Sequence, residues 1–162
     1  MSLTREEAWS ALAAIPDPEI PAISITDLGI VREVACANGH VDVTVTPTYS
    51  GCPATEMIQR DIVRALQAAG ADDVAVHLQL SPAWTTDWLS EDAKARLAAY
   101  GIAPPQTLAP DAARPVRFRP RIRCPRCGST HSEQLSAFGA TACKALYRCL
   151  ACREPFEYFK PI

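Results

Sequence analysis

Residues 30–46 have the sequence IVREVACANGHVDVTVT, and this stretch decides the fold of the first part of the chain. Asn38-Gly39 is typical of a two-residue β-turn, and it joins two stretches rich in β-branched residues. In the second stretch, valines at every other position share one face of a strand: Val41, Val43 and Val45. The sequence therefore predicts a β-hairpin with strands over 30–37 and 40–46.

A helix and a third strand are expected after the hairpin. Pro53 suits the first turn of a helix over 54–69, which has apolar residues at helical spacing: Ile58, Ile62, Val63 and Leu66. Residues 74–80 alternate again, which predicts a strand with one inward-facing row: Val74, Val76, Leu78 and Leu80.

Two further helices complete the first part of the chain. Thr4-Arg5-Glu6-Glu7 has the pattern of a capping box, and the helix that follows, with Trp9, Leu12 and Ala13 as its apolar stripe, must end before Pro16. Ser90 can cap a last helix over 91–100. The order α-β-β-α-β-α predicts an α+β fold class, a small mixed sheet with helices packed on it.

Charge and proline divide the 162 residues into two parts. Residues 1–103 carry 6 basic against 14 acidic side chains, a net of −8, whereas residues 104–162 carry 10 against 4, a net of +6. Five prolines within 104–120 indicate a linker. We therefore expect a domain over 1–103, a linker over 104–120 and a second, small domain over 121–162. No apolar run is long enough to cross a membrane and no export signal is visible, so we expect a cytoplasmic protein.

Four of the seven cysteines form two Cys-x-x-Cys pairs, Cys124/Cys127 and Cys149/Cys152, separated by 21 residues. Two such pairs supply four thiolates to one tetrahedral ion, and structural Zn²⁺ is the expected metal, with iron as the alternative. The second domain is too small to form a stable core unaided, so metal binding should hold it together. Cys143 lies between the pairs and is expected to be a buried or partly exposed thiol, not a ligand.

An arginine-rich run leads into these cysteines: Arg114, Arg117, Arg119, Arg121, Arg123 and Arg126. Such a run could contact nucleic acid, but the acidic first domain would repel phosphates. Docking onto the acidic first domain of the chain, or onto an acidic protein partner, is favoured, and no nucleic-acid or membrane partner is expected.

Cys52 precedes the predicted helix at 54–69, where unpaired N–H groups favour a thiolate. The alternative is a small residue that packs in a loop. No histidine lies near it in sequence, so a hydrolase-like base is lacking and an independent thiol enzyme is not expected. Three acidic residues lie in loops: Asp17, Glu19 and Asp27. Glu19 or Asp27 could serve as a general base, but loop caps and turn formation are favoured. Trp84 and Trp88 either pack on a core edge or form a partner surface.

Several of these stretches resemble the metal–sulfur cluster assembly family. They are DPEIP at 17–21, DLG at 27–29, TPTYSGCPA at 46–54 and SPAWTTDW at 81–88. The second part, with FGATACKALYRC at 138–149 and EPFEYFK at 154–160, resembles the zinc ribbon of one branch. That branch comprises the D-type (also J-type) accessory components of phenylacetyl-CoA oxygenase (epoxidase) systems.

The resemblance implies an accessory factor, not an enzyme, that helps assemble an iron–sulfur cluster or the diiron centre of the oxygenase in aerobic phenylacetate degradation. It implies that Cys52 is the reactive cysteine, that Asp17, Glu19 and Asp27 occupy the acidic loop positions, and that iron or a cluster is carried transiently. The implied partners are the oxygenase and reductase components, the iron–sulfur assembly machinery and a second copy of the chain. A purely structural subunit that holds the oxygenase complex together is the alternative function.

Overall fold

Two separate sheets organise the chain, one in each of two units. The computed structural model describes residues 2–106 and 121–162, and contacts divide it into Met1–Ala93 and Lys94–Ile162. The division between the two units falls inside a helix. The predicted domain bounds at 103 and 120 stay a prediction. Most of the predicted linker lies outside the described residues. Among the helices in the described ranges, none is both long and apolar enough to cross a bilayer.

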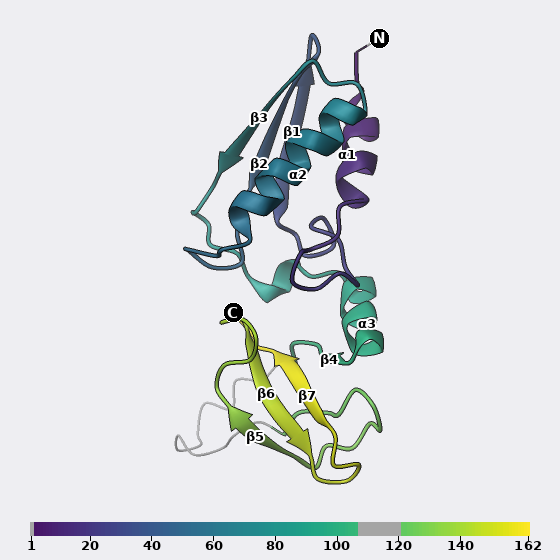
Figure 1. Ribbon diagram of the computed structural model, residues 1–162, viewed down its shortest axis with the longest axis vertical. Coiled ribbons are helices and arrows are strands. Elements are labelled where there is room, and N and C mark those ends of the chain that lie inside the picture. The colour runs from purple at the N-terminus through teal and green to yellow at the C-terminus, as the bar shows by residue number, and fades with distance from the viewer. Residues whose placement is uncertain (1, 107–120) are drawn as a thin grey trace. The chain divides into compact units, whose positions relative to one another are not determined.

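The first unit has the predicted element order, and Figure 1 shows α1 and α2 on one side of its sheet. Its elements are α1 (Arg5–Ala13), β1 (Val31–Ala37), β2 (His40–Val45), α2 (Thr55–Ala68), β3 (Asp73–Leu78), the 3₁₀ turn η1 (Thr86–Trp88) and the start of α3 (Glu91–Tyr100). The sheet order is β1-β2-β3, antiparallel between β1 and β2 and parallel between β2 and β3. The predicted α+β fold class is therefore confirmed.

The hairpin turn also fixes where the third strand begins. Asn38 and Gly39 have φ values of 49° and 80°, which only a few residue types adopt without strain. The carbonyl oxygen of Gly39 accepts hydrogen bonds from the N–H groups of Asp72 (2.9 Å) and Asp73 (3.3 Å). A Cβ at Gly39 would lie 2.2 Å from Asp72 Oδ2. One glycine thus turns the hairpin and aligns β3 beside β2.

The helices bury the faces that their spacing predicts, with three exceptions. In α2, Ile58, Ile62 and Leu66 are buried, but Val63 is half-buried because it faces the side of the helix that the sheet does not cover fully. The Thr4 capping box of α1 is confirmed. Its buried residues are Ala8 and Leu12, and the predicted stripe is wrong for Trp9, which is half-buried, and Ala13, which is exposed.

The predicted inward row of the third strand is wrong at its end. Leu78 and Leu80 are 50% and 60% exposed, and β3 itself ends at Leu78. The reason is position: β3 is the edge strand, so alternation places these leucines on the helix-covered face but beyond the cover that α2 provides.

The second unit has a four-stranded sheet of order β4-β7-β6-β5. These strands are β4 (Ile102–Ala103), β5 (Ser132–Ser136), β6 (Lys144–Cys149) and β7 (Pro155–Phe159). Its core includes three aromatic rings: Tyr147 stacks on Phe156 at 5.9 Å between centroids and meets Tyr158 edge-on at 5.7 Å. The side chains of Cys124 and Cys149 belong to the same core, so the predicted metal ligands are part of its packing.

Gly29 offers a test of how tightly the first unit is packed. Its φ is +74°, and an added Cβ would lie 2.9 Å from Trp88 Cβ and 3.1 Å from the Trp88 carbonyl oxygen. We expect Gly29→Ala to lower the free energy of unfolding by about 2–4 kcal/mol, the sum of left-handed backbone strain and overpacking. Gly51→Ala is the matched control, because φ is +81° there but nothing lies within 4 Å. Equal losses in the two variants, measured by urea unfolding, would contradict this account of the packing.

Candidate functional site

The four predicted ligands lie together in the second unit. The Sγ atoms of Cys124, Cys127, Cys149 and Cys152 all lie within 4.8 Å of one another. The Cys124–Cys152 and Cys127–Cys149 sulfurs are 3.8 Å and 3.5 Å apart. Cys124 and Cys149 are buried, Cys152 is half-buried and Cys127 is exposed. The group is therefore closed on one side by the core and reachable from the other.

Each pair of cysteines sits in a tight turn that aims two sulfurs at one point. The Gly128 N–H donates to Cys124 O at 2.9 Å, and the Cys152 N–H donates to Cys149 Sγ at 3.5 Å. The residue after each pair has a positive φ, 76° at Gly128 and 69° at Arg153. The two turns thus share a backbone conformation, although only the first has a glycine to relieve strain.

The sulfurs influence one another electrostatically. The N–H groups of Cys152 and Ala151 and the sulfur of Cys127 outweigh burial and lower the pKa of Cys149 to about 6. At Cys152 the Glu154 N–H acts in the same direction, but burial and the neighbouring sulfurs outweigh it and raise the pKa to about 11. The Cys149 thiolate therefore forms readily while Cys152 is held neutral, a balance that a bound cation would shift toward thiolates.

The donor set fits a tetrahedral metal ion. A Zn–S distance of about 2.3 Å implies sulfurs about 3.8 Å apart in a regular tetrahedron, close to both sulfur–sulfur distances given above. When bound, such a metal supplies a cross-link between the two turns. The residues present therefore support metal binding, and the arrangement has no open position for chemistry at the metal.

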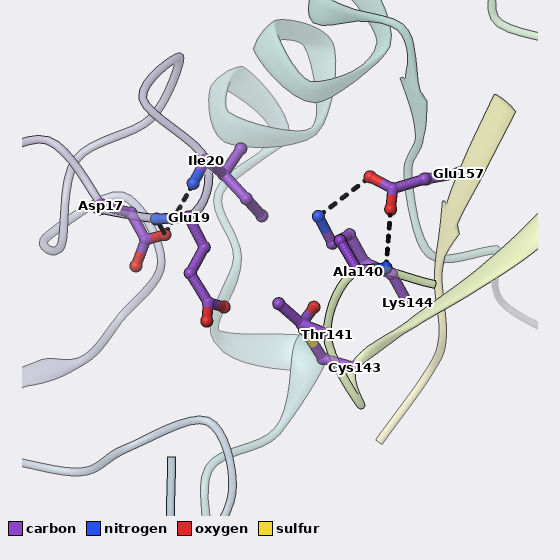
Figure 2. A network of polar contacts seen from close by, with 8 residues as sticks. All are labelled: Asp17, Glu19, Ile20, Ala140, Thr141, Cys143, Lys144 and Glu157. Carbon is purple, nitrogen blue, oxygen red and sulfur yellow. Dashed lines mark hydrogen bonds and ion pairs between the residues drawn. The ribbon is translucent and has the colours of Figure 1, made fainter. Parts of the chain in front are cut away.

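Cys143 lies outside this group. It is buried, and its Sγ lies 3.0 Å from Thr141 Oγ1. The next residue, Lys144, is only 3% exposed, and its Nζ lies 2.9 Å from Glu157 Oε2, as Figure 2 shows. Burial alone would raise the pKa of Glu157, but the Lys144 ammonium and the Ala140 N–H outweigh it and lower the pKa. The ion pair joins the start of β6 to β7, and the hydrogen bond from the Ala140 N–H to Glu157 Oε1 holds the β5–β6 loop to β7.

Cys52 lies in the loop between β2 and α2. Its N–H donates to Tyr49 O at 3.3 Å and its carbonyl oxygen accepts from the Thr55 N–H at 3.1 Å. The thiol is half-buried and, within 2–106 and 121–162, its sulfur makes no hydrogen bond. Helix α2 begins one residue later than predicted, and its N-cap residue Ala54 provides no side-chain cap. The Thr55 N–H is thus already engaged by the loop, whereas the next N–H groups of the first turn have no side-chain cap at Ala54.

The acidic candidates form turns in the loop between α1 and β1. Asp17 is buried, and its Oδ1 accepts from the N–H groups of Glu19 (2.9 Å) and Ile20 (2.8 Å), as Figure 2 shows. Asp27 Oδ2 accepts from the Ser24 N–H at 3.0 Å, while Ser24 Oγ accepts from the Asp27 N–H at 3.1 Å. Glu19 is half-buried. Turn formation, one of the two readings of these residues, thus accounts for Asp17 and Asp27.

The two tryptophans of the 81–88 stretch have different environments. Trp84 is 3% exposed and its Nε1–H donates to Leu28 O at 2.8 Å, so the candidate partner surface is wrong for Trp84, which packs in the core. Trp88 is half-buried, and the Arg32 guanidinium lies 3.6 Å from its ring centroid. The core-edge interpretation therefore applies to Trp84, and only Trp88 keeps an accessible face.

The sequence analysis missed a polar cluster on the open face of the first sheet. Asp42 Oδ1 lies 2.7 Å from His77 Nε2, and Asp42 Oδ2 lies 3.2 Å from His40 Nε2. Asp73 Oδ2 lies 2.8 Å from His40 Nδ1; this contact, together with Asp42, raises the pKa of His40. The hydrogen bond with His77 is the largest of the effects that lower the pKa of Asp42. Only the parallel register of β2 and β3, which the sequence did not predict, brings these residues together.

Known protein families match both parts of the chain. Residues 5–85 match the model described as "Iron-sulfur cluster assembly protein", and residues 109–160 match the model described as "PaaD zinc beta ribbon domain". The chain belongs to the iron–sulfur cluster assembly protein family. Within this family it is similar to a protein of Escherichia coli (strain K12) named as the D-type component of a "Putative 1,2-phenylacetyl-CoA epoxidase". The two are 54% identical over 96% of this chain and 92% of the relative.

Other relatives lack a counterpart to much of the second part. An "Fe-S protein maturation auxiliary factor" of Porphyromonas gingivalis is 35% identical over 58% of this chain and 90% of its own length. Among solved structures, the crystal structure of a domain of unknown function, DUF59, from Bacillus anthracis has a TM-score of 0.53 at 29% identity, covering 57% of this chain and 89% of its own. A conserved hypothetical protein from Thermotoga maritima has a TM-score of 0.51 at 29% identity, and the match covers 60% of this chain and 98% of that protein.

The four-cysteine group provides a test of what holds the second unit together. We expect Cys149→Ser to abolish metal binding and to unfold that unit, because its sulfur joins the metal group to the core. The three tryptophans, at positions 9, 84 and 88, all lie in the first unit, so their fluorescence should still report a cooperative unfolding transition. Near-ultraviolet circular dichroism of Tyr147 and Tyr158 should be lost. Loss of both signals together would show that the two units share one cooperative transition.

Proposed function

We propose that this protein is an accessory factor that assembles or repairs a metal–sulfur centre in a phenylacetyl-CoA oxygenase (epoxidase) system. The observation that carries the proposal is a match over nearly the whole chain to a relative named as an epoxidase component, combined with a family match for iron–sulfur assembly over 5–85. The relatives that share only the first part bear names of maturation factors. Their names and the family match over 5–85 favour a maturation role over catalysis, and the name of the epoxidase relative indicates the system in which that role would be carried out.

Cys52 is proposed as the thiol that holds iron or a cluster during transfer. It is half-buried in a loop, close in sequence to the uncapped start of α2. Cysteine sulfur is the ligand by which proteins hold iron–sulfur clusters, so a partly accessible thiol in this loop suits iron or a cluster as cargo. Asp17, Glu19 and Asp27 are proposed to shape the acidic loop of this site, since two of them fix its turns.

An independent thiol enzyme is disfavoured by the surroundings of Cys52. Nucleophilic catalysis by a cysteine needs a base within hydrogen-bond reach and a group that orients that base. In the described part of the chain the Cys52 sulfur has no hydrogen-bond partner, and His40 and His77 are engaged with Asp42 instead. Transfer of a bound metal centre requires no such base.

The second unit is proposed to be a structural zinc ribbon that recognises the client. One tetrahedral ion would use all four of its cysteine ligands, which would leave the ribbon no position for cargo. The proposed clients are the oxygenase and reductase components, with the iron–sulfur assembly machinery as the source of the cargo. The competing function is a structural subunit of the oxygenase complex, and it differs in that it needs no reactive Cys52.

The identity of the ribbon metal can be measured directly. We expect one equivalent of Zn²⁺ per chain, because four thiolates in a closed tetrahedron suit a metal with no redox chemistry. Elemental analysis of anaerobically purified protein, with Cys52→Ser to remove the cargo thiol, separates the ribbon metal from the cargo. Stoichiometric iron in that variant, with visible thiolate-to-iron absorption, would contradict a zinc ribbon.

The role of Cys52 is tested by the iron content of the client. Cys52→Ser should change the free energy of unfolding by less than about 0.5 kcal/mol, because the side chain is half-buried and similar in size. The oxygenase and reductase produced together with this variant should assemble as protein but contain less iron and turn over phenylacetyl-CoA poorly.

Cys36→Ser is the matched control, since Cys36 is another half-buried thiol but lies inside β1. Full iron loading of both clients with the Cys52 variant would contradict thiol-dependent transfer. A structural subunit would instead show normal iron in each component and a smaller complex only when the ribbon is disrupted.

A further inference from the structure

The outer edge of β3 lacks the features that normally protect an edge strand. Its pairing with β2 is continuous, without a bulge, and the sequence DVAVHL contains no lysine, arginine or proline. Leu78 and Leu80 are 50% and 60% exposed at its end. No strand in 2–106 or 121–162 pairs with this edge. Long apolar edges of this kind are templates for pairing with another strand.

The opposite edge of the same sheet is protected. The pairing of β1 with β2 shifts between Val31 and Glu33, which marks a bulge, and Arg32 is held there over the Trp88 ring. Bulges and charges are the usual means of blocking edge-to-edge association. The contrast indicates that β3 is the edge on which pairing takes place.

A shallow groove of about 730 Å³ runs beside β3, between the strand and α2. Its apolar floor is formed by Val63 of α2 and Val76 of β3. Its charged residues are ordered along the helix, with Glu56 in the first turn and Arg60 and Arg64 further along. Arg64 is 82% exposed and its nearest acidic partner, Asp61, is 3.9 Å away, so Arg64 can reach a second carboxylate.

We propose that β3 pairs antiparallel with β3 of a second copy of this chain, about a two-fold axis at Val76. The backbone supports this register. The Gln79 N–H donates to Val45 O at 2.8 Å, so odd-numbered residues direct their N–H and C=O groups toward β2. By alternation, the same groups of Val74, Val76 and Leu78 point outward. Pairing at Val76 sets Val76 opposite itself and Val74 opposite Leu78 of the second copy.

Charge complementarity favours a second copy over an unrelated partner. Because α2 runs antiparallel to β3, the same two-fold axis places two α2 helices side by side in opposite directions. The acidic first turn of each helix then lies beside the stretch of the other helix that carries Arg60 and Arg64, with Glu56 near Arg64 of the second copy. The groove and the strand edge are therefore self-complementary, as an interface between identical copies must be.

Sedimentation equilibrium of the full chain tests the proposal. The expected result is a mass of twice 17.5 kDa that falls toward 17.5 kDa on dilution. Leu78→Arg should raise the dimer dissociation constant about 100-fold or more. Each dimer loses two buried leucine side chains, and the loss of each should raise the dissociation constant about tenfold. Leu135→Arg is the matched control: Leu135 is 49% exposed on β5, a strand of the other sheet, and the dissociation constant should not change.

Charge reversal tests the register independently. Glu56→Arg and Arg64→Glu should each weaken the dimer, and the double variant should restore it, because the pair is exchanged across the axis. Amide exchange at Val76 in the unaltered protein should slow as concentration rises, which gives a readout that needs no variant.

The proposal is overturned by a monomer at every concentration, or by a dimer that Leu78→Arg leaves intact. A monomer whose β3 edge binds a client protein would assign this surface to that client instead, and would equally overturn the proposal. Tryptophan fluorescence verifies that the first unit of each variant is folded.

Discussion

The first unit depends on the backbone at Gly39. Its positive φ turns the hairpin, its carbonyl oxygen receives the N–H groups that open β3, and Asp72 lies where any Cβ would have to be. Because one residue aligns three strands, it also sets which side chains share a face. The parallel register that follows brings His77 to Asp42 and leaves the outward groups of β3 at an open edge.

The second unit depends on four sulfur atoms instead of a turn. Its core is small, and two of its buried members are the ligands Cys124 and Cys149. We therefore expect metal binding and core formation to be one event. The remaining cysteines have other environments: Cys143 is buried, Cys36 lies within a strand, and Cys52 is half-buried in a loop before a helix. In our account these different environments separate the four cysteines that hold a permanent structural metal from Cys52, which holds a transient cargo.

The sequence alone was sufficient for the helices and strands of the first unit, but it predicted neither the strands of the second unit nor what packs against each element. Local signals predicted the hairpin, the capping box at Thr4 and the four-cysteine group, since each depends on residues close together or on ligand spacing. The exposure of Leu78 and the burial of Trp84 could not be predicted, because both depend on what packs against them from distant parts of the chain. The link from His40 to His77 through Asp42 needed the parallel register for the same reason.

The central claim is that this chain passes a metal centre to a client. The most direct measurement is to load the anaerobic protein with ⁵⁷Fe and sulfide, mix it with the metal-free reductase or oxygenase component in the presence of an iron chelator, and follow the isotope by Mössbauer spectroscopy. Our account predicts that ⁵⁷Fe leaves a cysteine-ligated site on this protein and appears in the client centre despite the chelator. Iron captured entirely by the chelator, with zinc unchanged in the ribbon and the client still empty, would contradict it.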